Sequence, residues 1–132
     1  MERYDYNEAV FEDAKDFIKE RLDEMLRYDG TPIEQLDGDR IREELLDDAF
    51  LDDSVTGNGS GSYTFSTWQA EENLCHNTDL IEEVMFEFGY EPSATETHGA
   101  EWWDVSIRCM MLYRVFDDAF DKAIEELKEE FA

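Results

Sequence analysis

The sequence predicts a mainly α-helical protein, organised as a four-helix single domain with one flexible Gly/Ser-rich insertion. Apolar residues recur at three- and four-residue spacing along most of the chain, which is the period of an amphipathic helix. Gly or Pro follows these segments at points where a helix would end. The length of 132 residues suits one domain, and 42% hydrophobic and 14% aromatic residues are enough for a packed core. We therefore expect residues 1–132 to form a single acidic helical domain.

The first helix is expected over residues 5–28, where apolar side chains form one continuous stripe. The sequence Asp-Gly-Thr-Pro at 29–32 should end it, because Gly suits the position after a helix and Pro cannot continue one. A second, shorter helix is expected over 39–51. Either Asp37 or Asp39 could cap its first turn by accepting a hydrogen bond from a backbone N–H.

Residues 54–62 are rich in Gly and Ser and predict a flexible loop between the second and third helices. Because only two helices precede this segment, we interpret it as an insertion within one domain rather than a linker between two. The pair Asn58-Gly59 is also typical of a tight β-turn. A short β-hairpin, with residues 63–65 as one strand, is therefore an alternative to an irregular loop.

The third helix is expected over residues 67–88. Ser66 followed by Gln69 is a capping-box pattern at its start. The polar pair Asn77-Thr78 is a point at which this helix could break, and either side chain could cap a second segment. Gly89 comes just after the last apolar position and predicts the end of the helix.

The last helix is expected over residues 100–131, because apolar side chains keep helical spacing to the end of the chain. A strand is an alternative for residues 100–112, where apolar residues also alternate. The alternating positions are Trp103, Val105, Ile107, Cys109 and Met111. We favour the helix because its period continues without interruption into the following residues.

The charge balance restricts the class of partner. The chain has 36 Asp and Glu residues against 11 Lys and Arg, which gives a net charge of −25. This excludes direct binding to nucleic acid and disfavours an anionic membrane, because both need clustered positive charge. No apolar run is long enough to span a membrane, and no positively charged start leads into an apolar stretch, so we expect a soluble, cytoplasmic protein without a secretory signal. A basic protein surface, a cation or a high-salt habitat could each account for the acidity.

The acidic residues recur every four positions on each predicted helix, so that they stack in rows. The rows are Glu8, Glu12, Asp16, Glu20 and Glu24; Asp39, Glu43 and Asp47; Glu44, Asp48 and Asp52; Asp79, Glu83 and Glu87; and Asp117, Asp121, Glu125 and Glu129. Each like-charge pair at this spacing destabilises a helix by about 0.2–0.5 kcal/mol. One such row is usually a solvated face, but rows on every helix favour a surface that imitates the phosphates of a duplex. Adaptation to high salt is the alternative, and the high Phe, Trp and Met content argues against it.

Residues that would carry enzyme chemistry show no organised pattern. Cys75 and Cys109 lie in apolar helical segments, and we interpret them as buried free thiols. No Cys or His pair has the spacing of a metal site, so we predict no metal, no cofactor and no enzymatic activity.

Two other kinds of side chain stand out for their surroundings. Arg108 and Arg114 lie among apolar residues, and each is expected to pair with an acid one turn away, such as Asp104 or Asp118. The pair Trp102-Trp103 is expected to place one ring in the core and one at the surface, where an exposed Trp beside acids would anchor a partner.

The stretch from Tyr63 to Asn77 (YTFSTWQAEENLCHN), together with the acidic helix after it, resembles small uncharacterised accessory proteins of phages and conjugative elements. That resemblance implies a mobile-element setting and action in the cytoplasm of a host cell. Such elements commonly carry anti-CRISPR and anti-restriction proteins, several of which are acidic DNA mimics. By this analogy, the target would be a host defence protein.

The sequence therefore predicts a non-enzymatic inhibitor that binds the basic nucleic-acid-binding groove of a defence protein, such as a CRISPR effector nuclease or a restriction enzyme, by DNA mimicry. All the acidic rows are candidates for the contact, together with Trp102 and Trp103. The alternative is an acidic adaptor or assembly protein that binds a basic protein partner without competing with DNA. The oligomeric state does not follow from these patterns.

Overall fold

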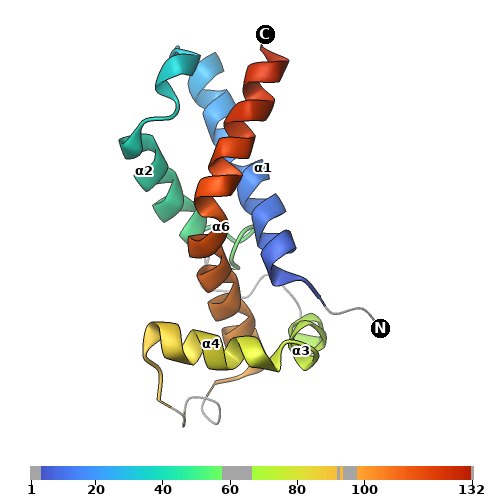
Figure 1. Ribbon diagram of the computed structural model, residues 1–132. Coiled ribbons are helices and arrows are strands. Elements are labelled where there is room, and N and C mark those ends of the chain that lie inside the picture. Colours follow the sequence, from blue (N-terminus) through green and yellow to red (C-terminus); the bar gives the residue numbers. More distant parts are fainter. Residues whose placement is uncertain (1–3, 58–66, 92, 94–97, 132) are drawn as a thin grey trace.

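The computed structural model describes residues 4–57, 67–91, 93 and 98–131 as helices joined by turns (Figure 1). Within these residues there are five α-helices, one short 3-10 helix and no strand, so the mainly α prediction is confirmed. The helices are α1 (Tyr6–Arg27), η1 (Ile33–Gln35), α2 (Asp39–Phe50), α3 (Thr67–Cys75), α4 (Thr78–Phe88) and α6 (Ala100–Glu130). The proposed hairpin at 58–65 and the Ser66 cap lie outside the described residues.

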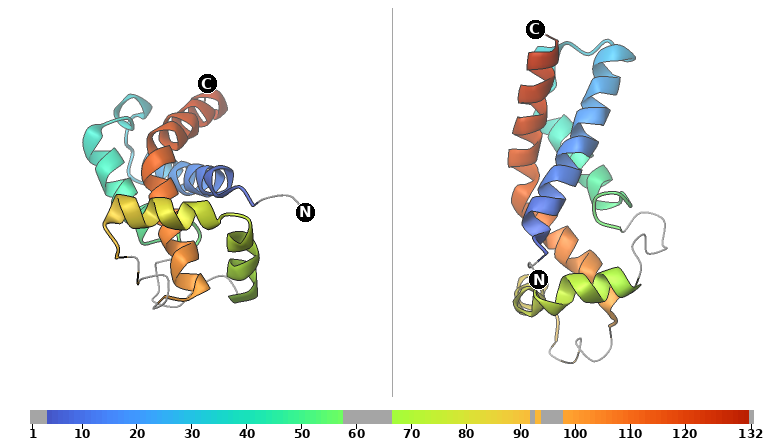
Figure 2. Two further views of the ribbon diagram at one scale, coloured as in Figure 1. Left: turned by 60° about the horizontal axis from the view of Figure 1, so that its bottom comes forward. Right: turned by 90° about the vertical axis from the view of Figure 1, so that its right-hand side faces the viewer.

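α1 and α6 form the central pair of the molecule and run side by side in the same direction (Figures 1 and 2). Asp5 caps the start of α1, and its carboxylate accepts a hydrogen bond from the Glu8 N–H at 3.0 Å. The predicted stop after α1 is confirmed. Gly30 takes a positive φ of 70°, and the Thr31 N–H donates to the Met25 carbonyl at 3.1 Å.

α2 packs beside the middle parts of α1 and α6 in Figure 1 and runs in the opposite direction to both. Its predicted cap is wrong. Gly38 is the N-cap residue and no side chain caps the helix, while Asp39 already lies in the first turn. The Asp37 carboxylate instead accepts hydrogen bonds from the Arg42 guanidinium. The Asp37 carboxylate, which local sequence rules would assign to the helix cap, is therefore used in an ion pair with Arg42.

The predicted third helix is interrupted at Asn77, which gives α3 and α4 and accounts for the additional helix. Asn77 is buried and its side-chain amide makes no capping bond. The amide donates to the carbonyls of Asn73 at 2.7 Å and Tyr4 at 2.9 Å. The hydrogen bond to Tyr4 thus joins the break between α3 and α4 to the segment just before α1. The end of α4 is as predicted, with Gly89 in the left-handed conformation and the Tyr90 N–H donating to the Met85 carbonyl.

α6 is helical from Ala100 onward, so the strand alternative for residues 100–112 is wrong. The alternating apolar pattern has a physical reason. α1 lies along α6, while α3 and α4 also pack against the half of α6 that begins at Ala100, so several faces are covered there. Trp103, Ile107, Cys109 and Met111 are therefore all buried, and the helical period is obscured.

Candidate interaction surface

Nearly all the positive side chains are used in pairs within the molecule. Among the Lys and Arg residues that the structure describes, each except Lys128 has a carboxylate oxygen no farther than 3.9 Å away. The chain carries 36 acidic and 11 basic residues, so a large excess of carboxylates remains. The rows that escape neutralisation are therefore the candidates for a negatively charged binding surface.

The row on α1 is the longest of the rows, and most of it escapes neutralisation. Its five members are all exposed: Glu8, Glu12, Asp16, Glu20 and Glu24. Glu12 pairs with Lys15 at 3.1 Å. Across the described parts of the chain, the other four carboxylates have no cation within ion-pair distance. The α1 row is therefore exposed to solvent along its whole length and has little intramolecular pairing.

The row on α6 is different because Arg42 of α2 neutralises its first half. The guanidinium contacts both Asp121 and Asp117, the latter at 3.3 Å, and its Cζ lies 4.3 Å from the centre of the Phe120 ring. Burial would lower the pKa of Arg42, but its hydrogen bonds to Asp121 and Asp37 raise it above the usual range. Asp117 and Asp121 thus hold α2 against α6 as well as facing water.

In the second half of the α6 row and in the two rows on α2, some acidic side chains are neutralised by ion pairs and others are not. Glu125 lies 3.6 Å from Lys122, whereas Glu129 is exposed. On α2, Glu44 pairs with Arg40 at 3.2 Å and Asp48 with Arg21 at 3.3 Å, while Asp52 is half-buried beyond the helix end. The members of the other α2 row are exposed and form no ion pair within the described residues: Asp39, Glu43 and Asp47.

The row on α4 faces outward near α6. Asp79, Glu83 and Glu87 are exposed, and Arg114 of α6 lies 3.4 Å from Glu87 and 3.9 Å from Glu83. Pairing with Asp118 was the sequence expectation for Arg114, and that is wrong. α4 lies across α6 in Figure 1 and brings closer acids to the guanidinium.

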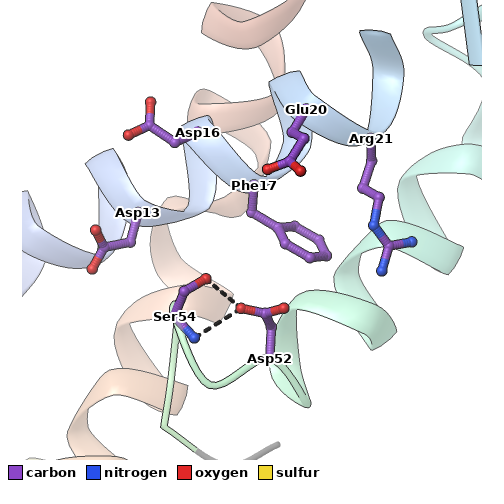
Figure 3. Close-up of a pocket in the computed structure, with 7 residues that line it drawn as sticks. All are labelled: Asp13, Asp16, Phe17, Glu20, Arg21, Asp52 and Ser54. Atoms are coloured by element: carbon purple, nitrogen blue, oxygen red, sulfur yellow. Dashed lines mark hydrogen bonds between the residues drawn. The ribbon is translucent and has the colours of Figure 1, made fainter. Parts of the chain in front are cut away.

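A pocket of about 300 Å³ opens between α1 and the turn after α2 (Figure 3). It is lined by Asp13, Asp16, Phe17, Glu20, Arg21, Asp52 and Ser54. Partial withdrawal from water raises the pKa of Asp13 above its usual value; Arg108 opposes this, and Asp16 and Glu12 add to it. Asp13 was not part of any predicted row, yet it adds negative charge beside the α1 row. This arrangement suits the ammonium or guanidinium groups of a partner.

A buried network connects α6 with α1 and α3. The Asp104 carboxylate and the Arg108 guanidinium pair at 2.9 Å and are almost fully buried, which confirms the predicted partner. Tyr6 donates its hydroxyl proton to Asp104 at 2.5 Å, and the Asn73 amide donates to the same carboxylate at 3.5 Å. Arg108 also donates to the Tyr4 hydroxyl at 3.2 Å. This network has a structural role and is closed to a partner.

The prediction for the two adjacent tryptophans was one ring in the core and one at the surface, and only the first part is confirmed. Trp103 is buried in the core. Trp102 is half-buried and stacks on the His98 ring with centroids 3.8 Å apart, and it forms a T-shaped pair with the Tyr90 ring, whose centroid is 5.0 Å away. It is therefore packed within an aromatic cluster and presents little free surface. Trp68 is the more exposed tryptophan, at 66%.

The cysteines also differ from each other. Both are free thiols, and Cys109 is buried as predicted, but Cys75 is exposed. Cys75 is the last residue of α3, just before the break at Asn77, and the prediction that its thiol is buried is wrong. Burial raises the pKa of Cys109 to about 11, against the opposing effect of its hydrogen bond with Thr56.

Phe86 is the most exposed large apolar residue in the described structure, and the sequence analysis did not single it out. Its ring is 91% exposed on the outer face of α4, while Leu80 and Val84 are buried on the inner face. The signal was present in the sequence. Residue 86 is two positions after 84, so it is rotated by about 200° around the helix from the buried stripe. A large apolar ring at such a position is out of phase with the core.

The described part of the chain contains no group of three or more His, Cys, Asp or Glu side chains arranged to hold a metal ion. None of its helices combines the length and the apolar character of a membrane span. No protein-family model, no curated protein and no solved structure matches this chain. The likeness of residues 63–77 to accessory proteins of mobile elements therefore stays a prediction.

Proposed function

We propose that this protein is a non-enzymatic inhibitor that occupies the basic nucleic-acid-binding groove of another protein by DNA mimicry. The observation that carries the proposal is the acidic row on α1: its members are exposed and, Glu12 apart, none forms an ion pair within the described residues. A host defence protein, such as a CRISPR effector nuclease or a restriction enzyme, is the target class that the resemblance suggests. The inhibitor would then act in the host cytoplasm.

The geometry of the α1 row supports this proposal. Successive members rise by about 6 Å along the helix axis and turn by about 40° in the right-handed sense. The carboxylates thus follow a shallow right-handed spiral, as the phosphates of one DNA strand do. A groove lined by Lys and Arg would gain from it the same attraction and the same release of counterions.

A second candidate function is an acidic adaptor that binds a basic protein without displacing DNA. The exposed Phe86 favours this candidate, because a duplex has no exposed apolar group that the Phe86 ring could imitate. The two candidates differ in one property. A DNA mimic and duplex DNA exclude each other from the partner, whereas an adaptor and DNA can bind together.

DNA competition tests the proposal directly. The protein is immobilised, and its partner is captured from a lysate of cells that contain the partner. Short duplex DNA is then added at about 0.15 M salt. We expect the DNA to displace the partner. A partner that stays bound at saturating DNA would rule out mimicry and leave the adaptor.

The α1 row is then tested with a matched pair of variants. In the first, Glu8, Asp16, Glu20 and Glu24 become the corresponding amides. In the control, four other exposed acids without ion pairs in the described structure become amides: Asp29, Glu34, Glu71 and Glu91. Both variants lose the same charge, so a difference between them reports position. We expect the association rate with the captured partner to fall about tenfold for the first variant and much less for the control. Equal association rates for the two variants would show that the α1 row does not contact the partner.

A further inference from the structure

The outer face of α4 combines a bare aromatic ring with a set of carboxylates. A hollow of about 710 Å³ lies there, lined by Asp79, Glu82, Glu83, Phe86, Glu87 and Arg114. Residues 79, 82, 83, 86 and 87 share one side of the helix, because they are spaced by three and four positions. Phe86 stands among them at 91% exposure, the highest of the large apolar side chains in the described structure.

This arrangement does not serve the stability of the fold. The apolar stripe that attaches α4 to the molecule includes Leu80 and Val84, and Phe86 is on the opposite side. Leaving a whole Phe side chain in water forgoes the free energy that its burial would contribute. An aromatic anchor surrounded by polar groups is, in contrast, the usual centre of a protein interface.

The charge around Phe86 restricts what could cover it. Four carboxylates surround the ring, and Arg114 offsets part of the charge of Glu83 and Glu87. A second copy of this chain would bring another net charge of −25 and would be repelled. Nucleic acid is excluded for the same reason. The face fits a segment that carries Lys or Arg beside an apolar stripe.

We propose that the outer face of α4 is a docking surface for a basic amphipathic helix of a partner protein, with Phe86 inserted into the apolar stripe of that helix. The inference takes the basic character of the partner from the proposed function and adds the apolar anchor. The carboxylates of Asp79, Glu82, Glu83 and Glu87 would contact the flanking Lys or Arg side chains. Charge would bring the partner to the surface, and burial of the ring would hold it there.

Two synthetic peptides test this surface. One is a helical peptide with Lys along one face and Leu along the other, and the second has Gln in place of each Leu, which keeps charge and helix propensity similar. Binding of each labelled peptide is followed by fluorescence anisotropy against the wild-type protein, Phe86→Ala and Tyr28→Ala. Tyr28 is the matched control, because its ring is 82% exposed and it follows α1 at the other end of the molecule.

We expect the Leu peptide to bind wild type at least about tenfold more tightly than the Gln peptide, and Phe86→Ala to remove that difference. Tyr28→Ala should retain it. Since both rings are exposed, circular dichroism should show unchanged helix content in both variants. The inference is overturned if Phe86→Ala keeps the preference for Leu, or if Tyr28→Ala loses it equally. It is also overturned if wild type forms dimers at low salt and the dimer is lost in Phe86→Ala, since a second copy would then be the occupant.

The outcome is independent of the DNA competition. Displacement of the captured partner by DNA, with no effect of Phe86→Ala on the peptides, supports the mimic and overturns the α4 docking surface. A partner that stays bound in the presence of DNA, with the Leu preference lost in Phe86→Ala, overturns the mimic and supports the docking surface.

Discussion

Asp13 lies at the edge of the pocket between α1 and the turn after α2, with its carboxyl group partly withdrawn from water. Its pKa is raised in the folded protein because of burial, with Asp16 and Glu12 adding to the effect of burial and Arg108 opposing it. The folded state therefore holds this proton more tightly than the unfolded chain does. It follows that the ionised Asp13 opposes folding at neutral pH, and that the opposition disappears as the pH falls below its ordinary pKa.

Asp13→Asn should accordingly stabilise the protein at pH 7. The amide avoids the cost of withdrawing a charge from water and the repulsion from Asp16 and Glu12, and these effects outweigh the lost attraction to Arg108, so a small rise in melting temperature is expected. The gain should shrink to nothing in acid, where wild type is protonated as well. Thermal melts of both proteins at several pH values measure this, with Asp29→Asn, at an exposed position after α1, as the control. A gain that persists at low pH would mean that the charge of Asp13 is not its cause.

At the scale of helices, the Asp104–Arg108 pair holds α6 to its neighbours through Tyr6 of α1 and Asn73 of α3. Because both charges are almost fully buried, removal of one leaves the other without its partner. Such a loss typically costs about 3–5 kcal/mol, a large part of the roughly 5–15 kcal/mol that stabilises a domain.

Arg108→Met should therefore reduce the free energy of unfolding by about 3–5 kcal/mol, as measured by urea denaturation. The double variant Asp104→Leu, Arg108→Met should recover part of the loss, because it leaves no unpaired charge in the core. Arg40→Met, on an exposed pair with Glu44, is the control and should have little effect. If the double variant were less stable than Arg108→Met, the buried charge would not be the cause of the loss.

The helices themselves followed closely from the sequence. The expected ranges of 5–28, 39–51 and 100–131 compare with Tyr6–Arg27, Asp39–Phe50 and Ala100–Glu130. Periodicity and stop residues act locally, so one chain segment is enough to recognise them. They also indicated the break at Asn77 and the end at Gly89.

The partners of individual side chains did not follow in the same way. Arg114 pairs with acids of α4 rather than with Asp118, and Arg42 joins α2 to Asp117 and Asp121 of α6. These contacts depend on how helices far apart in the chain come together, which spacing along one helix does not encode. The same reason explains the candidate site. The α1 row could be read from its spacing, but which rows are neutralised could not.

For the molecule as a whole, the excess of acidic groups means that long-range repulsion opposes the compact state. Salt screens repulsion between exposed charges, and it also weakens the attraction within exposed ion pairs. With 36 acids against 11 bases, the repulsive contacts outnumber the attractive ones. The balance therefore favours stabilisation by added salt.

The melting temperature should rise between about 0.01 M and about 0.15 M sodium chloride, as the screening length falls from roughly 30 Å to roughly 8 Å. Differential scanning calorimetry measures the rise. Loss of stability over that range would indicate that the ion pairs dominate. A protein that is unfolded at about 0.15 M and folds only in molar salt would point instead to adaptation to a saline habitat.

α6 is one uninterrupted helix with two sets of neighbours. α1 accompanies it along most of its length, whereas α3 and α4 lie against the half that begins at Ala100 (Figure 1). We expect α3 and α4 to open more readily than the α1–α6 pair, because they pack against only part of α6. The amide protons of α4 should therefore exchange with solvent sooner than those at the centre of α6. The docking face would then belong to the part of the molecule with the lower opening free energy. A partner bound there would slow proton exchange locally and leave the long helical pair unchanged.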